Sequence, residues 1–286
     1  MTLPTPPVVG AAEGTAEATA GDGLADDLAF AVDVATAAGR LLMDRYERVE
    51  RVDYKSARDI VTEVDHLSEE LIIGAIRERF PGDGILAEES GEQAAPGGGA
   101  PTSGRGRVWI VDPVDGTINY ANGIPFFCVS VGLAVDGRPA VGVVVDPSRA
   151  EVFAASADGP ATLNGQPIET SDKDKLTDFV VQMALAGRSV ATRVRKVRKA
   201  IRISRSMGSS ALALSYVANG RFDAFIQQSG MSNWDVAAAG LIAERAGATV
   251  TAGDGGPWFD VGRGSRAVGA VAAPPAHHAA ILELIR

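Results

Sequence analysis

The sequence predicts a mixed α/β fold, because segments with helical spacing and short apolar segments typical of buried strands both occur along the chain. Helical spacing is clearest over residues 24–48 and 65–80, and the apolar strand of residues 108–111 ends in Asp112. Strand ends are where α/β proteins hold ligands, because the sheet fixes side chains that face a crevice. With 286 residues, the chain can form one large domain or two of ordinary size.

Composition limits the classes of protein to which the chain can belong. The net charge is −9, so the overall field favours neither nucleic acid nor an anionic membrane, and an anionic substrate would need a local metal ion or local basic residues. The single cysteine cannot form an intramolecular disulfide, and no run of about 18 apolar residues predicts a membrane span. The first 39 residues lack Lys and Arg, unlike the start of a secretory signal. We therefore expect a cytoplasmic protein.

The N-terminal third is predicted to contain a tail, two helices and a short strand. Residues 1–23 are rich in Ala, Thr, Pro and Gly without periodicity, which is typical of disorder. Residues 24–48 form an amphipathic scaffold helix, and a second helix starts near Asp65. An acidic residue at a helix start is often only a cap. The strand of residues 85–87 ends in Glu88.

The middle of the chain is predicted to be rich in strands. A Gly/Pro loop at residues 94–106 comes first, and it is either a tolerated surface insertion or a mobile lid, because candidate ligands flank it on both sides. Strands follow at residues 126–135, 140–146 and 150–155, and the sequence Leu-Asn-Gly-Gln at residues 163–166 indicates a hairpin.

The last third is predicted to form a second domain that begins with a strand at residues 180–185. Residues 188–205 are basic, and we consider a solvated helix face, a nucleic-acid patch, or side chains that attract an anionic substrate. The small polar residues 206–210 precede an apolar helix, and its free amides either bind an anion or receive an ordinary Ser cap.

Toward the C-terminus, a strand at residues 222–227 precedes a helix that begins at Asp235, which on local grounds is an N-cap. A strand at residues 267–272 and a helix at residues 277–285 close the chain. We expect the adjacent histidines at positions 277 and 278 to be solvated and assign them no role.

Five acidic residues at the ends of predicted elements favour a site for hard divalent cations. Three His and one Cys disfavour a zinc site of the Cys/His type. An all-oxygen set suits Mg²⁺ or Mn²⁺, and without metal so many carboxylates would repel one another. With two or three ions, such a cluster supports phosphoryl transfer. Gly116 allows close backbone approach, the amides after it can face an anion, and Thr117 adds a hydroxyl. The five acids are Asp65, Glu88, Asp112, Asp115 and Asp235.

The same stretch has a rival interpretation. Asp-x-Asp-Gly-Thr after an apolar strand is the aspartyl-nucleophile signature of haloacid-dehalogenase-type phosphatases, in which a single residue separates the two acids. Here two residues, the first of them Pro113, separate Asp112 from Asp115. This spacing argues against a covalent aspartyl-phosphate.

Four motifs resemble those of the inositol monophosphatase family, within the Mg-dependent, lithium-sensitive phosphatases. DPVDGTINY resembles the family's DPIDGTxNF, LAEES its GEES, NWDVAAAG its WDxAAG and DIVTEVD its DLVTxxD, all in the family's order. The resemblance covers about residues 24–286. It implies a five-layered αβαβα sandwich with an α+β domain over residues 24–178 and an α/β domain over residues 179–286, and it implies a homodimer.

The resemblance also implies a ligand set for two to three Mg²⁺ ions. Glu88, Asp112 and the carbonyl of Val114 would bind the first ion. Asp112, Asp115 and Asp235 would bind the second, and Glu88 would help to hold a weaker third ion that takes part in catalysis.

The remaining implied roles concern water and substrate. Asp65 and Thr117 match the pair that orients and deprotonates the attacking water, which sets aside the cap interpretation of Asp65 and of Asp235. The amides of Gly116 and Thr117 would hold phosphate oxygens. The implied activity is that of an inositol-1-phosphatase-like phosphomonoesterase in which metal-activated water attacks a small phosphate ester directly. The residues that would contact the rest of the substrate are Gly208, Ser209, Ser210 and Asp235.

One position departs from the family's pattern. Members that select inositol phosphate carry a Glu seven residues before the Asp of the WD motif, and counting back from Asp235 gives Gln228. A neutral amide can still bond a substrate hydroxyl, but the charged acceptor is gone. Arg205 resembles the usual partner of that Glu and is left with a neutral neighbour.

The substrate is therefore open. An inositol monophosphate or related sugar phosphate, fructose 1,6-bisphosphate, histidinol phosphate, 3′-phosphoadenosine 5′-phosphate and NADP all remain alternatives, and the basic stretch could favour a bis-anionic one. The second hypothesis is a binding or regulatory protein that keeps the fold without turnover.

Overall fold

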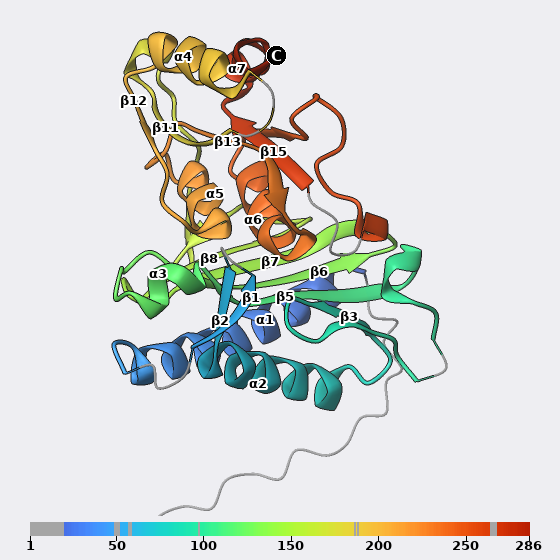
Figure 1. Cartoon of the computed structure of the whole chain (residues 1–286). Coiled ribbons are helices and arrows are strands. Elements are labelled where there is room, and N and C mark those ends of the chain that lie inside the picture. Colours follow the sequence, from blue (N-terminus) through green and yellow to red (C-terminus); the bar gives the residue numbers. More distant parts are fainter. Residues whose placement is uncertain are drawn as a thin grey trace, which may run out of the picture.

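The computed structural model describes residues 20–48, 52–56, 59–96, 98–185, 187, 189–263 and 268–286. The α-helices are α1 (Ala20–Arg45), α2 (Glu63–Arg79), α3 (Thr117–Ala121), α4 (Val190–Ala200), α5 (Ser210–Ala218), α6 (Asn233–Arg245) and α7 (Pro275–Ile285). Figure 1 shows five layers: α1 with α2, the larger sheet, α5 with α6, the smaller sheet, and α4 with α7. The predicted αβαβα sandwich is confirmed.

The larger sheet has eight strands in the order β10-β9-β8-β7-β6-β5-β3-β4. Neighbours are antiparallel except for the parallel pair β3–β5. The predicted hairpin at residues 163–166 joins β9 to β10. The strands are β3 (Gly84–Ala87), β4 (Gly91–Gln93), β5 (Arg107–Asp115), β6 (Cys128–Val135), β7 (Arg138–Asp146), β8 (Glu151–Ser156), β9 (Thr162–Leu163) and β10 (Gln166–Pro167).

The smaller sheet has five strands in the order β12-β11-β13-β15-β14. β12, β11 and β13 run parallel, while β15 is antiparallel to both of its neighbours. A separate two-stranded ribbon pairs β1 with β2. The strands are β1 (Val52–Ser56), β2 (Asp59–Thr62), β11 (Val180–Ala184), β12 (Ile203–Arg205), β13 (Ala224–Met231), β14 (Thr249–Thr251) and β15 (Val268–Ala273), and the short 3₁₀ turns are η1 (Pro101–Ser103), η2 (Leu176–Asp178) and η3 (Val261–Arg263).

The apolar character of β5 follows from its place between two helical layers. Trp109 and Val111 pack in the core under α1 and α2, whereas Val108 and Ile110 pack in a second cluster beneath α6. Because successive side chains of a strand point to opposite faces, both faces of β5 must be apolar. The strand therefore shows no polar alternation until its end at the site.

Several predicted boundaries shift. The first helix begins at Ala20, so residues 20–23 belong to α1 and not to a tail, and residues 1–19 lie outside the described part. The loop of residues 94–106 contains η1, whose Pro101 is buried.

His278 is not solvated, which corrects the prediction. It is 6% exposed, and its Nε2 lies 3.1 Å from the hydroxyl of Thr251. Burial lowers the pKa of its imidazole, so the neutral form is favoured. Among the described residues, no helix combines the length and apolar character that a membrane span requires.

Two glycines let α6 lie directly on the larger sheet. Gly132 of β6 pairs with Gly142 of β7 across the ladder. A Cβ at Gly142 would lie 2.5 Å from the carbonyl oxygen of Ala238 in α6, and one at Gly132 would lie 3.2 Å from the Cβ of Ala237. The close approach positions the N-terminal end of α6 beside the end of β5.

Gly142→Ala should destabilise the fold by about 1–3 kcal/mol, because the added methyl group overlaps the backbone of α6. The expected result is a Tm several degrees lower in thermal unfolding. Gly74→Ala in α2 is the matched control, since a Cβ there has no atom within 4 Å and Ala favours a helix. An unchanged Tm for Gly142→Ala would contradict the close packing.

Candidate active site

A β-bulge brings two aspartates together at the end of β5. In a regular strand, residues three positions apart point to opposite faces. The pairing of β5 with β6 shifts between Asp112, which is opposite Ser130, and Asp115, which is opposite Cys128, so β5 carries one extra residue. The bulge turns both carboxylates toward the same space, and both side chains are buried.

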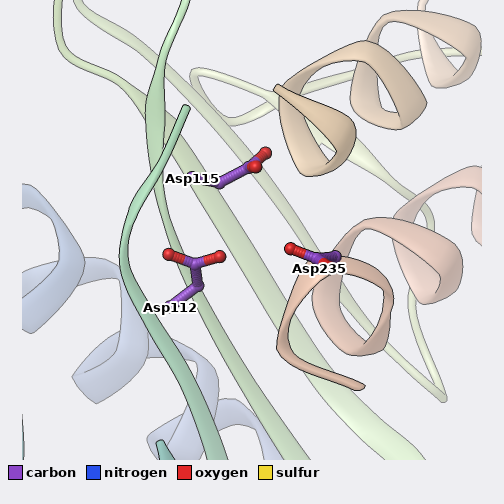
Figure 2. Close-up of side chains that lie close together, drawn as sticks. All are labelled: Asp112, Asp115 and Asp235. Carbon is purple, nitrogen blue, oxygen red and sulfur yellow. The ribbon is translucent and has the colours of Figure 1, made fainter. Parts of the chain in front are cut away.

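The third aspartate comes from the start of α6. Asp235 is the acidic member of a capping box, and its Oδ2 accepts the backbone N–H of Ser232 at 2.5 Å. Figure 2 shows Asp112 and Asp115 of β5 close to Asp235 at the start of α6. One carboxylate oxygen of each lies within 4.8 Å of the others. The structure thus brings Asp235 together with two residues of β5 that are far from it in the sequence.

The electrostatics of this cluster favour a bound cation. Burial raises the pKa of Asp112 well above its usual range, and the charges of Glu88 and Asp115 raise it further. Burial also raises the pKa of Asp235, with the charge of Asp115 as the next cause. Ionised carboxylates held this closely repel one another, and a divalent cation would offset the repulsion. An all-oxygen donor set of this kind fits Mg²⁺ or Mn²⁺.

The start of α5 holds Asp115. Its Oδ2 accepts the hydroxyl of Ser209 at 2.5 Å and the backbone N–H of Ala211 at 2.6 Å. Burial raises the pKa of Asp115, whereas these hydrogen bonds lower it by stabilising the ionised form. Ser209 is also the N-cap of α5, because its hydroxyl accepts the N–H of Leu212. Of the two alternatives for this segment, the Ser cap is confirmed, and its hydroxyl also contacts the carboxylate of Asp115.

The aspartates line a cavity of about 330 Å³. Glu88, which follows β3, lies in its wall, as do Val114 and the glycines at positions 116 and 208. Among the described residues, no Lys, Arg or His lines the cavity. The lining residues are Glu88, Asp112, Val114, Asp115, Gly116, Thr117, Ile118, Gly208, Gly230, Ser232, Trp234 and Asp235.

Asp65 and Thr117 meet at one side of this cavity. The hydroxyl oxygen of Thr117 lies 2.9 Å from Asp65 Oδ1 and 2.9 Å from the carbonyl oxygen of Val114, and its single hydrogen can serve only one of them at a time. Asp65 Oδ2 accepts the N–H and the hydroxyl of Thr62, the N-cap of α2. Asp65 is therefore not the N-cap of α2, but it takes part in the capping box at position N3 and also contacts Thr117. Asp235 takes the same N3 position in α6, whose N-cap is Ser232.

Two glycines with left-handed backbones shape the site. Gly116 has a φ of 97°, and a Cβ there would lie 3.1 Å from the carbonyl oxygen of Phe126. Gly208 has a φ of 86°, and a Cβ there would lie 2.8 Å from Nδ2 of Asn119. Asn119 of α3 donates to the carbonyls of Phe126 and Met207, both at 2.7 Å. This side chain, which the sequence did not single out, ties α3 to the segment before α5.

Gln228 does not face the site, which corrects the prediction. Along β13, Phe225 packs against the middle helices and Ile226 against the outer ones. By this alternation Gln228 faces outward. Its side chain accepts a hydrogen bond from Arg193 and donates to the carbonyl of Ile285 at 3.2 Å. Its basic neighbour is therefore Arg193 and not Arg205.

The inward position belongs to Gln227, whose Oε1 accepts the hydroxyl of Ser210 at 3.3 Å. The ladder of β13 with β15 is irregular between Gln227 and Met231. A count of residues along the sequence does not register extra residues in a bulge, so it could not tell which of the two adjacent glutamines faces inward.

The basic stretch lies on the outer side of the smaller sheet, in α4 and β12. Arg188 lies outside the described residues. The interpretation as a solvated face is confirmed for six side chains, none of which lines the cavity. These exposed residues are Arg195, Lys196, Arg198, Lys199, Arg202 and Arg205.

Comparisons with known proteins agree with the fold. A model of the inositol monophosphatase family matches residues 24–286. Nus factor SuhB of Pseudomonas aeruginosa is 35% identical over 236 residues, which cover 78% of this chain and 84% of that protein. Inositol monophosphatase 3 of Solanum lycopersicum is 35% identical over 230 residues, with the same 78% and 84% coverage.

One sequence match and one solved structure, both from Thermotoga maritima, extend the comparison. A fructose-1,6-bisphosphatase/inositol-1-monophosphatase is 34% identical over 227 residues, covering 79% of this chain and 84% of that protein. The solved structure of an IMPase superposes with a TM-score of 0.80 at 30% identity, over 91% of this chain and 96% of that one. The fold and the acidic cluster define an αβαβα protein with a site suited to divalent cations. The chain belongs to the inositol monophosphatase family.

Asp112→Asn should stabilise the protein when no divalent cation is present. A carboxyl group whose folded-state pKa is raised stabilises the fold below its unfolded pKa and loses that contribution as the pH rises through the folded value. At pH 7 to 8 in a chelator, the neutral amide should therefore raise Tm, while it keeps the acceptor for the Val114 N–H. Asp158→Asn on an exposed turn is the control. A lower Tm for Asp112→Asn would contradict the repulsion.

Proposed function

We propose that the protein is a Mg²⁺-dependent phosphomonoesterase that acts on a small phosphorylated metabolite. The convergence of Asp112, Asp115 and Asp235 within 4.8 Å carries the proposal. Glu88 and Val114 line the same cavity, and the Glu88 carboxylate and the Val114 carbonyl would complete the donor set. Bound Mg²⁺ would lower the pKa of a water molecule and stabilise charge on the phosphate group.

Thr117 and Asp65 would move the proton of the attacking water. The threonine hydroxyl can accept a hydrogen bond from that water while it donates its own hydrogen to Asp65 Oδ1, 2.9 Å away. Burial raises the pKa of Asp65, which makes its carboxylate a better proton acceptor. Two hydrogen bonds from Thr62 fix the orientation of that carboxylate. The amides of Gly116 and Thr117 would bind phosphate oxygens.

The proposed substrates are phosphates of inositol and related sugars or polyols. This class is supported by the names of the tomato relative, an inositol monophosphatase, and of the Thermotoga relative, a fructose-1,6-bisphosphatase/inositol-1-monophosphatase. Ser210 and Gln227 would contact the part of the substrate beyond the phosphate, because they lie beside the residues that hold Asp115.

Asp115→Asn should abolish Mg²⁺-dependent phosphate release. The side-chain oxygen of Asn can still accept the N–H of Ala211, and its amide nitrogen, a donor, would then face the cation position. Release of inorganic phosphate from inositol 1-phosphate, with and without Mg²⁺, measures the effect. Circular dichroism checks the fold, and Asp158→Asn should retain activity. Full activity of folded Asp115→Asn would refute the metal assignment.

Gln227→Glu should selectively raise the use of inositol 1-phosphate relative to fructose 1,6-bisphosphate. A carboxylate at the inward position is a stronger acceptor for a substrate hydroxyl, and it repels a second phosphate group. The ratio of kcat/KM for the two substrates is the measurement. Gln228→Glu is the matched control, since the same change on the outward side chain should leave the ratio unchanged. The reverse pattern would show that residue 228 selects the substrate.

A second candidate is a binding or regulatory protein without turnover. It is favoured by relatives named Nus factor SuhB in Pseudomonas aeruginosa, Pasteurella multocida and Xylella fastidiosa. The presence of the whole acidic cluster and of the Thr117–Asp65 contact favours the enzyme instead. A panel of the substrates above, histidinol phosphate, 3′-phosphoadenosine 5′-phosphate and NADP with Mg²⁺ separates the two, because only the enzyme releases phosphate.

A further inference from the structure

One face of α2 carries three buried polar side chains that reach three segments around the cavity. Asp65 contacts Thr117, and the hydroxyl of Ser68 donates to the carbonyl of Pro113 at 3.1 Å, inside the β5 bulge. Glu69, which is 4% exposed, reaches the turn between β3 and β4. Residues four positions apart share a helix face, so α2 presents Asp65 and Glu69 on the same side.

Glu69 binds two consecutive backbone amides. Its Oε2 accepts the N–H of Glu89 at 2.8 Å, and its Oε1 accepts the N–H of Ser90 at 2.9 Å. Ala87 and Gly91 pair across the β3–β4 ladder, so the turn between them consists of only three residues, the first of which is Glu88. Hydrogen bonds from amides to an ionised carboxylate are among the stronger ones in proteins.

The backbone of Glu88 is thereby held on both sides. Its own N–H donates to the carbonyl of Val111 at 3.2 Å, one residue before Asp112 on β5. The two amides after it donate to Glu69. With both flanking peptide groups fixed, the direction in which the Glu88 side chain leaves the backbone is fixed as well. Glu69 itself is absent from the residues that line the cavity.

We propose that Glu69 is a positioning residue that aims Glu88 at the divalent cation. The proposal rests on the proposed function, in which Glu88 is a Mg²⁺ ligand. Glu69 does not touch the ion or the substrate and acts only through the backbone of the β3–β4 turn.

Two substitutions of Glu69 distinguish its effect on the position of Glu88 from the effect of its negative charge. Glu69→Gln keeps the length of the side chain, but its amide nitrogen would meet a backbone donor, so one of the two hydrogen bonds is lost. Glu69→Asp keeps the charge, but it is one methylene shorter and cannot reach both amides from the same helix position. If position matters, both substitutions weaken the site; if only negative charge near the cation matters, Glu69→Asp does not. Glu70→Gln, on the exposed side of α2, is the matched control.

Isothermal titration of the full-length protein with MgCl₂, without substrate, measures the effect directly. Both Glu69 variants should bind Mg²⁺ roughly 10- to 100-fold more weakly, as is common when a group that orients a metal ligand is changed. Glu70→Gln should bind as the unaltered protein does. In phosphate release, the half-saturating Mg²⁺ concentration should rise in parallel, and activity should recover at high Mg²⁺, whereas a purely structural role would lower Tm without this shift.

A double-mutant cycle tests whether Glu69 acts through Glu88. Glu88→Gln alone should weaken Mg²⁺ binding, and adding Glu69→Gln to it should weaken binding no further. Circular dichroism checks each fold, and Glu69→Asp replaces Glu69→Gln in the cycle if the latter does not fold. Normal Mg²⁺ affinity in both Glu69 variants, a loss confined to Glu69→Gln, or additive losses in the cycle would overturn the proposal. If the unaltered protein binds no Mg²⁺, the proposed function itself fails.

Discussion

Carboxylates buried beside one another repel when they ionise, and the fold around the cavity holds them in place against that repulsion. Each of the three aspartates of the cluster accepts at least one nearby backbone N–H, which fixes its orientation without neutralising it. The second oxygen of each then remains available for a cation. The amide donors are Val114 for Asp112, Ala211 for Asp115 and Ser232 for Asp235. Because two of these amides belong to helix starts, the local positive end of α5 or α6 also favours the ionised form.

The layered architecture explains how these helix starts reach the end of β5. The middle helices pack between two sheets, and the glycine pair at positions 132 and 142 removes the side chains that would otherwise hold α6 away from the larger sheet. On the opposite face, α2 supplies the contacts to Thr117, to the carbonyl of Pro113 and to the β3–β4 turn. The cavity therefore lies where β3 and β5 end, and helices on both faces of the larger sheet contribute to it. Neither helical layer alone could assemble it.

The sequence predicted the five layers and the acids at strand and helix ends, because hydrophobic periodicity and family motifs are local signals. It treated a cap and a contact to Thr117 as alternatives, whereas Asp65 makes both, since a carboxylate has two oxygens. The sequence did not single out Glu69, because a glutamate on an amphipathic helix is usually solvated. Its position four residues after Asp65, which places both on the same helix face, was the one signal that could have identified it. The identity of the inward glutamine could not be predicted, because residue counting assumes a regular strand, and β13 is irregular there.

The placement of the two glutamines also bears on selectivity. The cavity wall is acidic and, in the described residues, contains no Lys, Arg or His, so an anionic substrate depends on the cation for its attraction. In the proposed function, a carboxylate at position 227 would add one more negative charge beside the substrate's distal groups and would disfavour a second phosphate there. The neutral amide of Gln227 removes that repulsion while it keeps a hydrogen-bond acceptor and a donor for hydroxyls.

Arg193 cannot supply an attraction for a second phosphate group, because it bonds Gln228 on the outer face of β13. Tolerance of a bis-anionic substrate in this site would therefore arise from the absence of a repelling group, and the basic outer helix would contribute at most to long-range steering.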